Sequence, residues 1–183
     1  MIMNKTRLTL EQRVQRIEDI EAIRRLKSTY HLYINDTAFE KVATLYTDDA
    51  YVNYSYLMPG GKPWVGKSEI SAAFASMKTN EGQSQIKQFL HSHIVDVKDE
   101  NYANGTAILL ACYGVGVESY VVSGKYIEEY ARVEEEWLFK SMRLALYFTV
   151  PLKDGWAGLK RHYLVNSGAV IPDYVDLLPN API

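Results

Sequence analysis

The stretch IEDIEAIRRLKSTYHLY, residues 17–33, decides how this chain begins to fold. Apolar side chains recur in it at spacings of three and four, the periodicity of a helix with one buried face. This apolar stripe consists of Ile17, Ile20, Ile23, Leu26, Tyr30 and Tyr33. The charged residues, Lys27 among them, fall largely outside the stripe. Thr9 and Gln12 resemble a capping box, so we expect the helix to begin there.

Beyond Asn35 and Asp36 the pattern predicts two short helices and then a series of strands, in which apolar residues alternate with polar ones. The expected helices are 38–46 and 67–77, and the expected strands are 50–57, 88–98, 105–118, 124–134 and 137–150. Helices grouped before hairpin-connected strands indicate an α+β domain with a mostly antiparallel curved sheet that encloses a cavity. We expect this domain to span residues 1–150. An irregular proline-containing extension, 151–183, would pack on the pocket or on a neighbouring subunit.

The composition excludes several classes of function. Lys and Arg number 20 against 22 Asp and Glu, which argues against nucleic acid as a partner. A single cysteine, Cys112, excludes a disulfide framework and a zinc site built on paired cysteines. No apolar run is long enough for a membrane span or a signal peptide, so we expect a cytoplasmic protein without membrane contact. The 14 tyrosines suit an apolar cavity with a few hydroxyl groups.

Two histidines stand close together in the expected strand 88–98. Strand alternation places Phe89, His91 and His93 on one face, together with valines. An imidazole on such a face, beside a carboxylate, is the minimal equipment for abstracting a proton. The alternative is a solvated strand end. A metal site would need a third ligand, such as Asp36, Glu118 or His162, and no spacing indicates one.

Several aromatic residues are candidates for the lining of the cavity. Tyr30 and Tyr33 lie on the helical stripe and Tyr54 on the first strand, where a hydroxyl could stabilise developing negative charge. Each could equally be a core residue whose hydroxyl is satisfied by the backbone. Trp64 and Tyr113 complete the expected substrate-binding set, with Tyr33, His93 and Phe89.

The order of these features resembles a known family. The segments that carry the resemblance are 18–26 with Tyr30, 39–46, Asp49-Ala50, Trp64-Val-Gly66, His91, 124–132 and Trp137. They are similar to the SnoaL-like branch of the nuclear transport factor 2-like superfamily, which includes scytalone dehydratase, bile acid 7-alpha-dehydratase and hexachlorocyclohexane dehydrochlorinase. The resemblance covers residues 10–150. It implies a cone-shaped α+β roll, a curved antiparallel sheet around N-terminal helices, with a pocket at the open end.

The resemblance also implies a chemistry. Dehydratase-type members pair a histidine base with an aspartate at the end of the first helix, use tyrosines to polarise the substrate, and need no cofactor or metal. His91 matches that histidine, and Tyr30 and Tyr54 match pocket tyrosines. Asn35 occupies the position of the aspartate, and Asp36 follows it. We therefore expect a carboxyl oxygen of Asp36 within hydrogen-bond reach of a His91 ring nitrogen, directly or through one water, or else Asn35 as the partner of His91.

Two functional classes follow. The first is a cofactor-independent lyase or isomerase, dehydratase-like, acting on a small cyclic, polyketide-like or steroid-like hydrophobic substrate through histidine-mediated proton abstraction. The second is a non-catalytic protein that binds a small hydrophobic ligand in the same pocket. A carboxylate beside the histidine would distinguish the enzyme from the binding protein. We also expect an oligomer, because the strand 137–150 carries apolar residues on both faces. The resemblance implies a homodimer or homotrimer formed through the outer face of the sheet.

Overall fold

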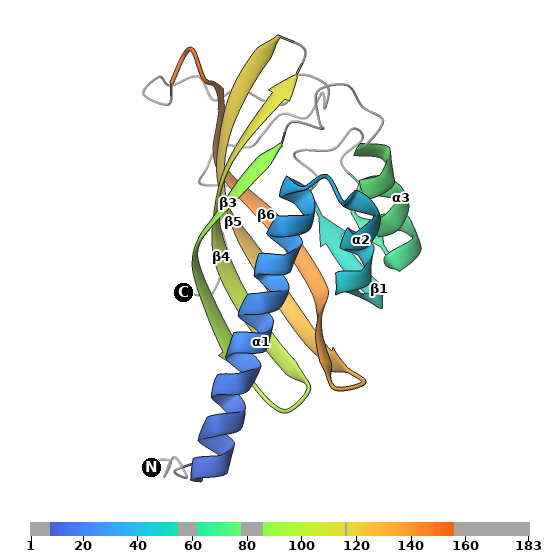
Figure 1. The fold of residues 1–183 in the computed structure, drawn as a ribbon, viewed down its shortest axis with the longest axis vertical. Coiled ribbons are helices and arrows are strands. Elements are labelled where there is room, and N and C mark those ends of the chain that lie inside the picture. The colour runs from blue at the N-terminus through green and yellow to red at the C-terminus, as the bar shows by residue number, and fades with distance from the viewer. Residues whose placement is uncertain (1–7, 55–61, 78–85, 116, 156–183) are drawn as a thin grey trace.

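The computed structural model of the chain describes residues 8–54, 62–77, 86–115 and 117–155. The elements, labelled in Figure 1, are the helices α1 (Leu10–Asn35), α2 (Phe39–Val42) and α3 (Lys67–Met77), a 3-10 turn (Ala43–Leu45), and the strands β1 (Tyr46–Asn53), β2 (Trp64–Val65), β3 (Lys87–Val97), β4 (Tyr102–Val115), β5 (Glu118–Val133) and β6 (Glu136–Pro151). No helix in these ranges is long and apolar enough to cross a membrane.

The strands form one curved sheet in the order β2-β1-β6-β5-β4-β3. Neighbouring strands are antiparallel except β1 and β6, which run parallel. The long helix α1 crosses the concave face of the sheet, and α2 and α3 cover the end that carries β1 (Figure 1). The expected α+β roll is confirmed. The predicted 151–183 extension lies mostly outside the described residues.

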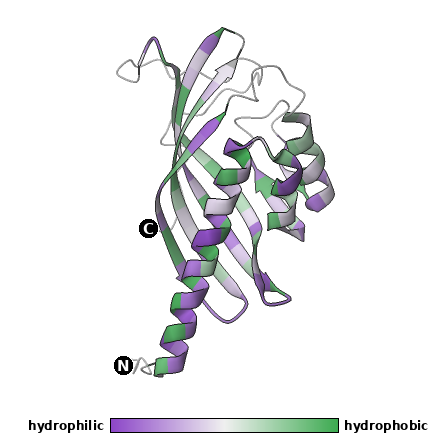
Figure 2. Ribbon diagram, in the orientation of Figure 1, coloured by the Kyte–Doolittle hydropathy of each residue, from purple (hydrophilic) through white to green (hydrophobic). Residues whose placement is uncertain are grey.

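The helix α1 begins where the capping box predicts. The Thr9 hydroxyl accepts a hydrogen bond from the backbone of Gln12, whose side chain in turn accepts one from the backbone N–H of Thr9. Hydrophilic and hydrophobic residues alternate along the whole length of α1 (Figure 2). The expected stripe is wrong at two residues: Ile17 is 67% exposed, whereas Lys27 is fully buried.

Two strands depart from simple alternation because each contains an irregularity in its pairing. On β3, Leu90 and His93 pair with positions 109 and 107 of β4, so two residues of β3 oppose one residue of β4. On β6, the register to β5 shifts twice, beside Tyr130 and beside Gly124. Each shift moves the inward-facing residues from odd to even numbers or back. The apolar residues on both faces of the 137–150 pattern follow in part from these shifts.

The C-terminal end of α1 is fixed to the edge strand β3 at Asn35, whose carbonyl oxygen accepts a hydrogen bond from the Lys87 ammonium and whose side chain bonds the β3 backbone. The Asn35 amide donates to the carbonyl oxygen of Gln88 at 2.8 Å, and its Oδ1 accepts from the Gln88 backbone N–H at 2.6 Å. The amide thus pairs with the free backbone edge of β3 as a neighbouring strand would. It sets the position of α1 over the concave face.

This pairing predicts an asymmetry between two neighbouring isosteric changes. Asn35→Asp replaces the donating NH2 by an oxygen that faces the Gln88 carbonyl, so we expect a loss of about 1–3 kcal/mol in the free energy of unfolding. Asp36→Asn, at an exposed position, should change it by about 0.5 kcal/mol or less. Urea unfolding of both variants measures the difference. Equal stability of the two would contradict the role assigned to Asn35.

Candidate functional site

A buried ion pair joins α1 to the middle of the sheet. Tyr126, Glu128 and Tyr130 alternate on β5 so that all three face α1. Glu128 Oε1 lies 2.5 Å from Lys27 Nζ, and both side chains are 0% exposed. The ammonium also lies 3.4 Å from the centre of the Tyr126 ring. Burial lowers the pKa of Lys27, and the Glu128 carboxylate opposes that shift.

His93 lies on the other side of the same carboxylate. Its Nε2 is 3.0 Å from the Tyr130 hydroxyl and 3.6 Å from Glu128 Oε2. The Tyr130 hydroxyl donates a hydrogen bond to Glu128 Oε2 at 2.6 Å, so the hydroxyl oxygen is left to accept a hydrogen bond from His93. Nε2 therefore carries the proton and Nδ1 the free lone pair. Nδ1 is buried and has no hydrogen-bond partner among the described residues.

The protonation state of His93 suits a base. Burial lowers the pKa of this imidazole, as do Lys27 and Arg24, while the Glu128 carboxylate raises it. The net direction is downward, so His93 is neutral at pH 7 and able to accept a proton. A carboxylate that holds the opposite ring nitrogen through a tyrosine can stabilise the imidazolium that would form.

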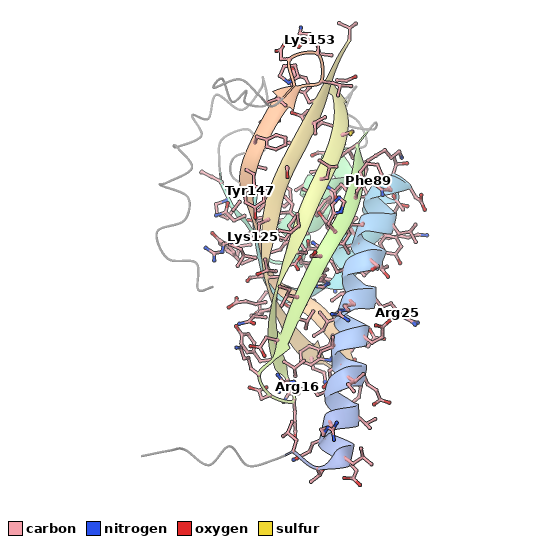
Figure 3. All side chains as sticks on the ribbon, turned by 90° about the vertical axis from the view of Figure 1, so that its left-hand side faces the viewer. Arg16, Arg25, Phe89, Lys125, Tyr147 and Lys153 are labelled. Atoms are coloured by element: carbon pink, nitrogen blue, oxygen red, sulfur yellow. The ribbon has the colours of Figure 1, made fainter. Side chains whose placement is uncertain are left out.

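His91 does not share this face, contrary to the expectation from alternation. It is exposed, and so is Phe89 (50%), because the irregularity between Leu90 and His93 reverses which residues point inward. Asp36 is also exposed, and no hydrogen bond or ion pair within the described ranges joins it or Asn35 to His91. The expected Asp36–His91 pair is therefore wrong. Figure 3 shows Phe89 near the upper end of β3.

Tyr30 and Tyr54 are brought together at the centre of the core. Their hydroxyl oxygens are 3.0 Å apart, and Tyr54 donates to the sulfur of Met142 at 2.7 Å. Burial raises the pKa of Tyr30 to about 12 and that of Tyr54 well above 10, so both phenols are neutral donors. The half-buried Trp64 packs edge-on against Tyr54, with the ring centres 5.7 Å apart.

The other predicted lining residues lie apart from this group. Tyr33 is half-buried, and the Lys41 ammonium lies 5.8 Å from its ring centre. Tyr113 stacks on Tyr120 with ring centres 5.1 Å apart and shares a hydrogen bond with Thr149. Along β4, Tyr113 is four residues beyond the position that pairs with Gly124, so it belongs to the far end of the sheet. The binding roles of both tyrosines remain predictions.

A third imidazole, His31, belongs to the buried group and was not among the predicted site residues. It is 5% exposed, and neither ring nitrogen has a hydrogen-bond partner among the described residues. Burial, reinforced by Lys27 and His93, lowers the pKa of His31 to about 2. His31 is therefore a neutral imidazole at any ordinary pH.

Sequence reasoning also missed Lys27, Glu128 and Tyr130. Helical spacing could have found Lys27, which follows Ile23 by four residues and precedes Tyr30 by three. Period-two alternation from Tyr126 could have found Glu128 and Tyr130. The described residues contain no group of three or more His, Cys, Asp or Glu side chains that could hold a metal ion.

Comparison with known proteins agrees with this architecture. A family model described as "SnoaL-like domain" matches residues 15–143. A solved structure from Novosphingobium aromaticivorans, for which a scytalone dehydratase activity is proposed, has a TM-score of 0.65 at 17% identity, over 84% of this chain and 97% of that one. A hexachlorocyclohexane dehydrochlorinase (LinA) type 2 gives 0.66 at 17% identity, over 76% and 92%.

An NTF2-like protein with a cystatin-like fold, also from Novosphingobium aromaticivorans, gives a TM-score of 0.58 at 20% identity, over 84% of this chain and 95% of that one. No curated protein matches the chain. At these identities the likeness concerns the fold, and the activities of the similar structures belong to those proteins.

The ion pair predicts a strong and specific dependence on Lys27. Lys27→Met leaves the Glu128 carboxylate buried without its cation, so we expect a loss of about 3–5 kcal/mol in the free energy of unfolding. Removing both charges, in Lys27→Met/Glu128→Gln, should recover much of that loss. Arg25→Met, at an exposed position of the same helix (Figure 3), is the matched control. Additive losses in the double variant, measured by urea unfolding, would contradict the pairing.

The buried imidazole predicts acid sensitivity. Unfolded His31 takes up a proton near its ordinary pKa of 6.5, whereas folded His31 does so only near 2. Between these values the unfolded state binds more protons, so the stabilisation present above pH 6.5 declines as the pH falls toward 2. We expect the unfolding free energy to drop less between pH 7.5 and pH 4.5 in His31→Phe than in the wild type. Parallel pH profiles of the two proteins would refute this.

Proposed function

The chain belongs to the SnoaL-like domain family of the nuclear transport factor 2-like superfamily, and from that premise we propose that it is a cofactor-independent lyase or isomerase. It would act, dehydratase-like, on a small cyclic, polyketide-like or steroid-like hydrophobic substrate. The observation that carries the proposal is the His93–Tyr130–Glu128 arrangement, a neutral imidazole whose protonated nitrogen faces a hydroxyl held by a carboxylate.

In this proposal His93, rather than His91, is the base. Its Nδ1 takes a carbon-bound proton from the substrate, and the electron pair of the broken C–H bond forms a C=C bond while the π pair of an adjacent carbonyl moves onto the substrate oxygen. The imidazolium that forms lies 3.6 Å from Glu128 Oε2. Glu128 thereby supplies the carboxylate that the family resemblance predicts at the end of the first helix, where this chain has Asn35 bound to the backbone of β3.

We propose that Tyr30 and Tyr54 stabilise, by hydrogen bonds, the negative charge that develops on the substrate oxygen. The Tyr54 hydroxyl donates a hydrogen bond to the sulfur of Met142, which is a weak acceptor. A substrate oxygen could therefore take over that hydrogen bond at little cost. Both phenols remain protonated at pH 7 because burial raises their pKa. They are donors suited to an enolate or a leaving oxygen.

The second candidate, a binding protein for a small hydrophobic ligand, is favoured by a different observation. His91 and Asp36, which the family resemblance would pair, are both exposed and unconnected. A chain that has lost that pair could retain the fold for binding alone. Proton abstraction by His93 distinguishes the two candidates directly.

We also propose an oligomeric state and a cellular location for the protein. The outer face of the sheet, which carries Lys125 and Tyr147 away from α1 (Figure 3), is the expected interface of a homodimer or homotrimer. Ile94, 69% exposed, lies on the adjoining edge strand β3. We expect the protein to work in the cytoplasm.

The cyclic ketone 2-tetralone, which has acidic C–H bonds next to its carbonyl, provides the test. We expect the wild type to accelerate exchange of these protons with solvent deuterium, followed by NMR. His93→Gln should lose at least about 100-fold of this acceleration, the typical contribution of a general base. His91→Gln is the matched comparison. Loss at His91 alone would restore the prediction from sequence, and binding without exchange by the wild type would favour the binding protein.

A further inference from the structure

His31 is the least explained polar group in the described part of the chain. An imidazole has one donor and one acceptor, and each of them lowers the stability of the fold when it is buried without a partner. Both ring nitrogens of His31 are in that condition. A phenylalanine would fill similar volume without the cost. The position therefore carries a polar group that the fold does not use.

The surroundings of His31 are those of the proposed site. Its ring packs edge-on against Tyr30 and Tyr126, with centres 5.3 and 5.9 Å away. The same Tyr126 ring carries the Lys27 ammonium on its face. Lys27 and His93 both face the Glu128 carboxylate, and Lys27 also lies on the Tyr126 ring against which His31 packs, so the three groups share one buried neighbourhood. The carboxylate in this neighbourhood is that of Glu128, and it is already paired with Lys27.

We propose that His31 donates a ring N–H to the oxygen of a bound carbonyl compound, which makes enolisable ketones and esters the substrate class. This inference rests on the proposed function and narrows it. Haloalkanes, which lack such an oxygen, would not use His31.

The chemistry balances without a further reagent. His93 Nδ1 takes the α-proton, the C–H electron pair forms the C=C bond of an enolate, and the carbonyl π pair moves to oxygen. The His31 N–H holds that oxyanion without transferring its proton. A neutral imidazole is suited to this role because it polarises a carbonyl while its conjugate acid is too costly to form in the same place. The enolate then expels a leaving group or is reprotonated by His93.

The experiment compares two ligands of nearly identical shape, 2-tetralone and its carbonyl-free analogue tetralin. The wild type should bind the ketone about tenfold more tightly, the worth of one hydrogen bond of about 1.4 kcal/mol. His31→Phe should reduce that preference to within about threefold, whereas His31→Gln, which keeps an N–H donor, should retain more of it. The 15N resonance of the protonated His31 nitrogen should shift with 2-tetralone and not with tetralin.

Each other outcome has a definite meaning. Equal binding of the two ligands, no binding of either, or a preference that survives in His31→Phe without an NMR shift would overturn the proposal for His31. The NMR measurement on the wild type decides if the phenylalanine variant fails to fold. Deuterium exchange tests the proposed enzyme activity separately from the role of His31. A His31-dependent preference without exchange refutes the enzyme alone, and His93-dependent exchange without the preference refutes only His31.

Discussion

The ion pair between Lys27 and Glu128 constrains the rest of the structure. A charge buried at 0% exposure is tolerated only with a close partner, so α1 cannot slide or rotate over the sheet without separating the two groups. The same carboxylate receives the Tyr130 hydroxyl, which faces His93. One pair thus fixes the helix on the sheet and sets the proton arrangement of the histidine beside it.

The secondary structure follows from local patterns because these depend on each element alone. The capping box at Thr9, the helical stripe around Ile23 and the alternation of Tyr126 and Tyr130 each predict what the structure contains. The second expected helix is shorter, since Tyr46 already belongs to β1. Its expected continuation conflicts with pairing between β1 and β6, a contact distant in sequence that no local pattern reveals.

The candidate site was harder to predict because it depends on pairing register. One extra residue between Leu90 and His93 leaves His93 facing inward and turns His91 outward, and the sequence around them has no glycine or proline to mark the irregularity. The family resemblance supplied the correct fold but the wrong partner. Asn35, at the expected acid position, holds the backbone of Gln88 instead. A role transferred by position assumes that the side chain is free to perform it.

Stability alone does not account for the polar groups of this core. Well-packed hydrophobic residues of similar volume are often as stabilising as a buried ion pair, or more so. Here the imidazoles of His31 and His93 lie beside the Lys27–Glu128 pair. Three of their four ring nitrogens have no hydrogen-bond partner among the described residues. An imidazole that no neighbour satisfies lowers stability wherever it is merely structural. Three such nitrogens beside one ion pair, on elements distant in sequence, fit the proton transfer that we propose, in which function is selected at the expense of stability.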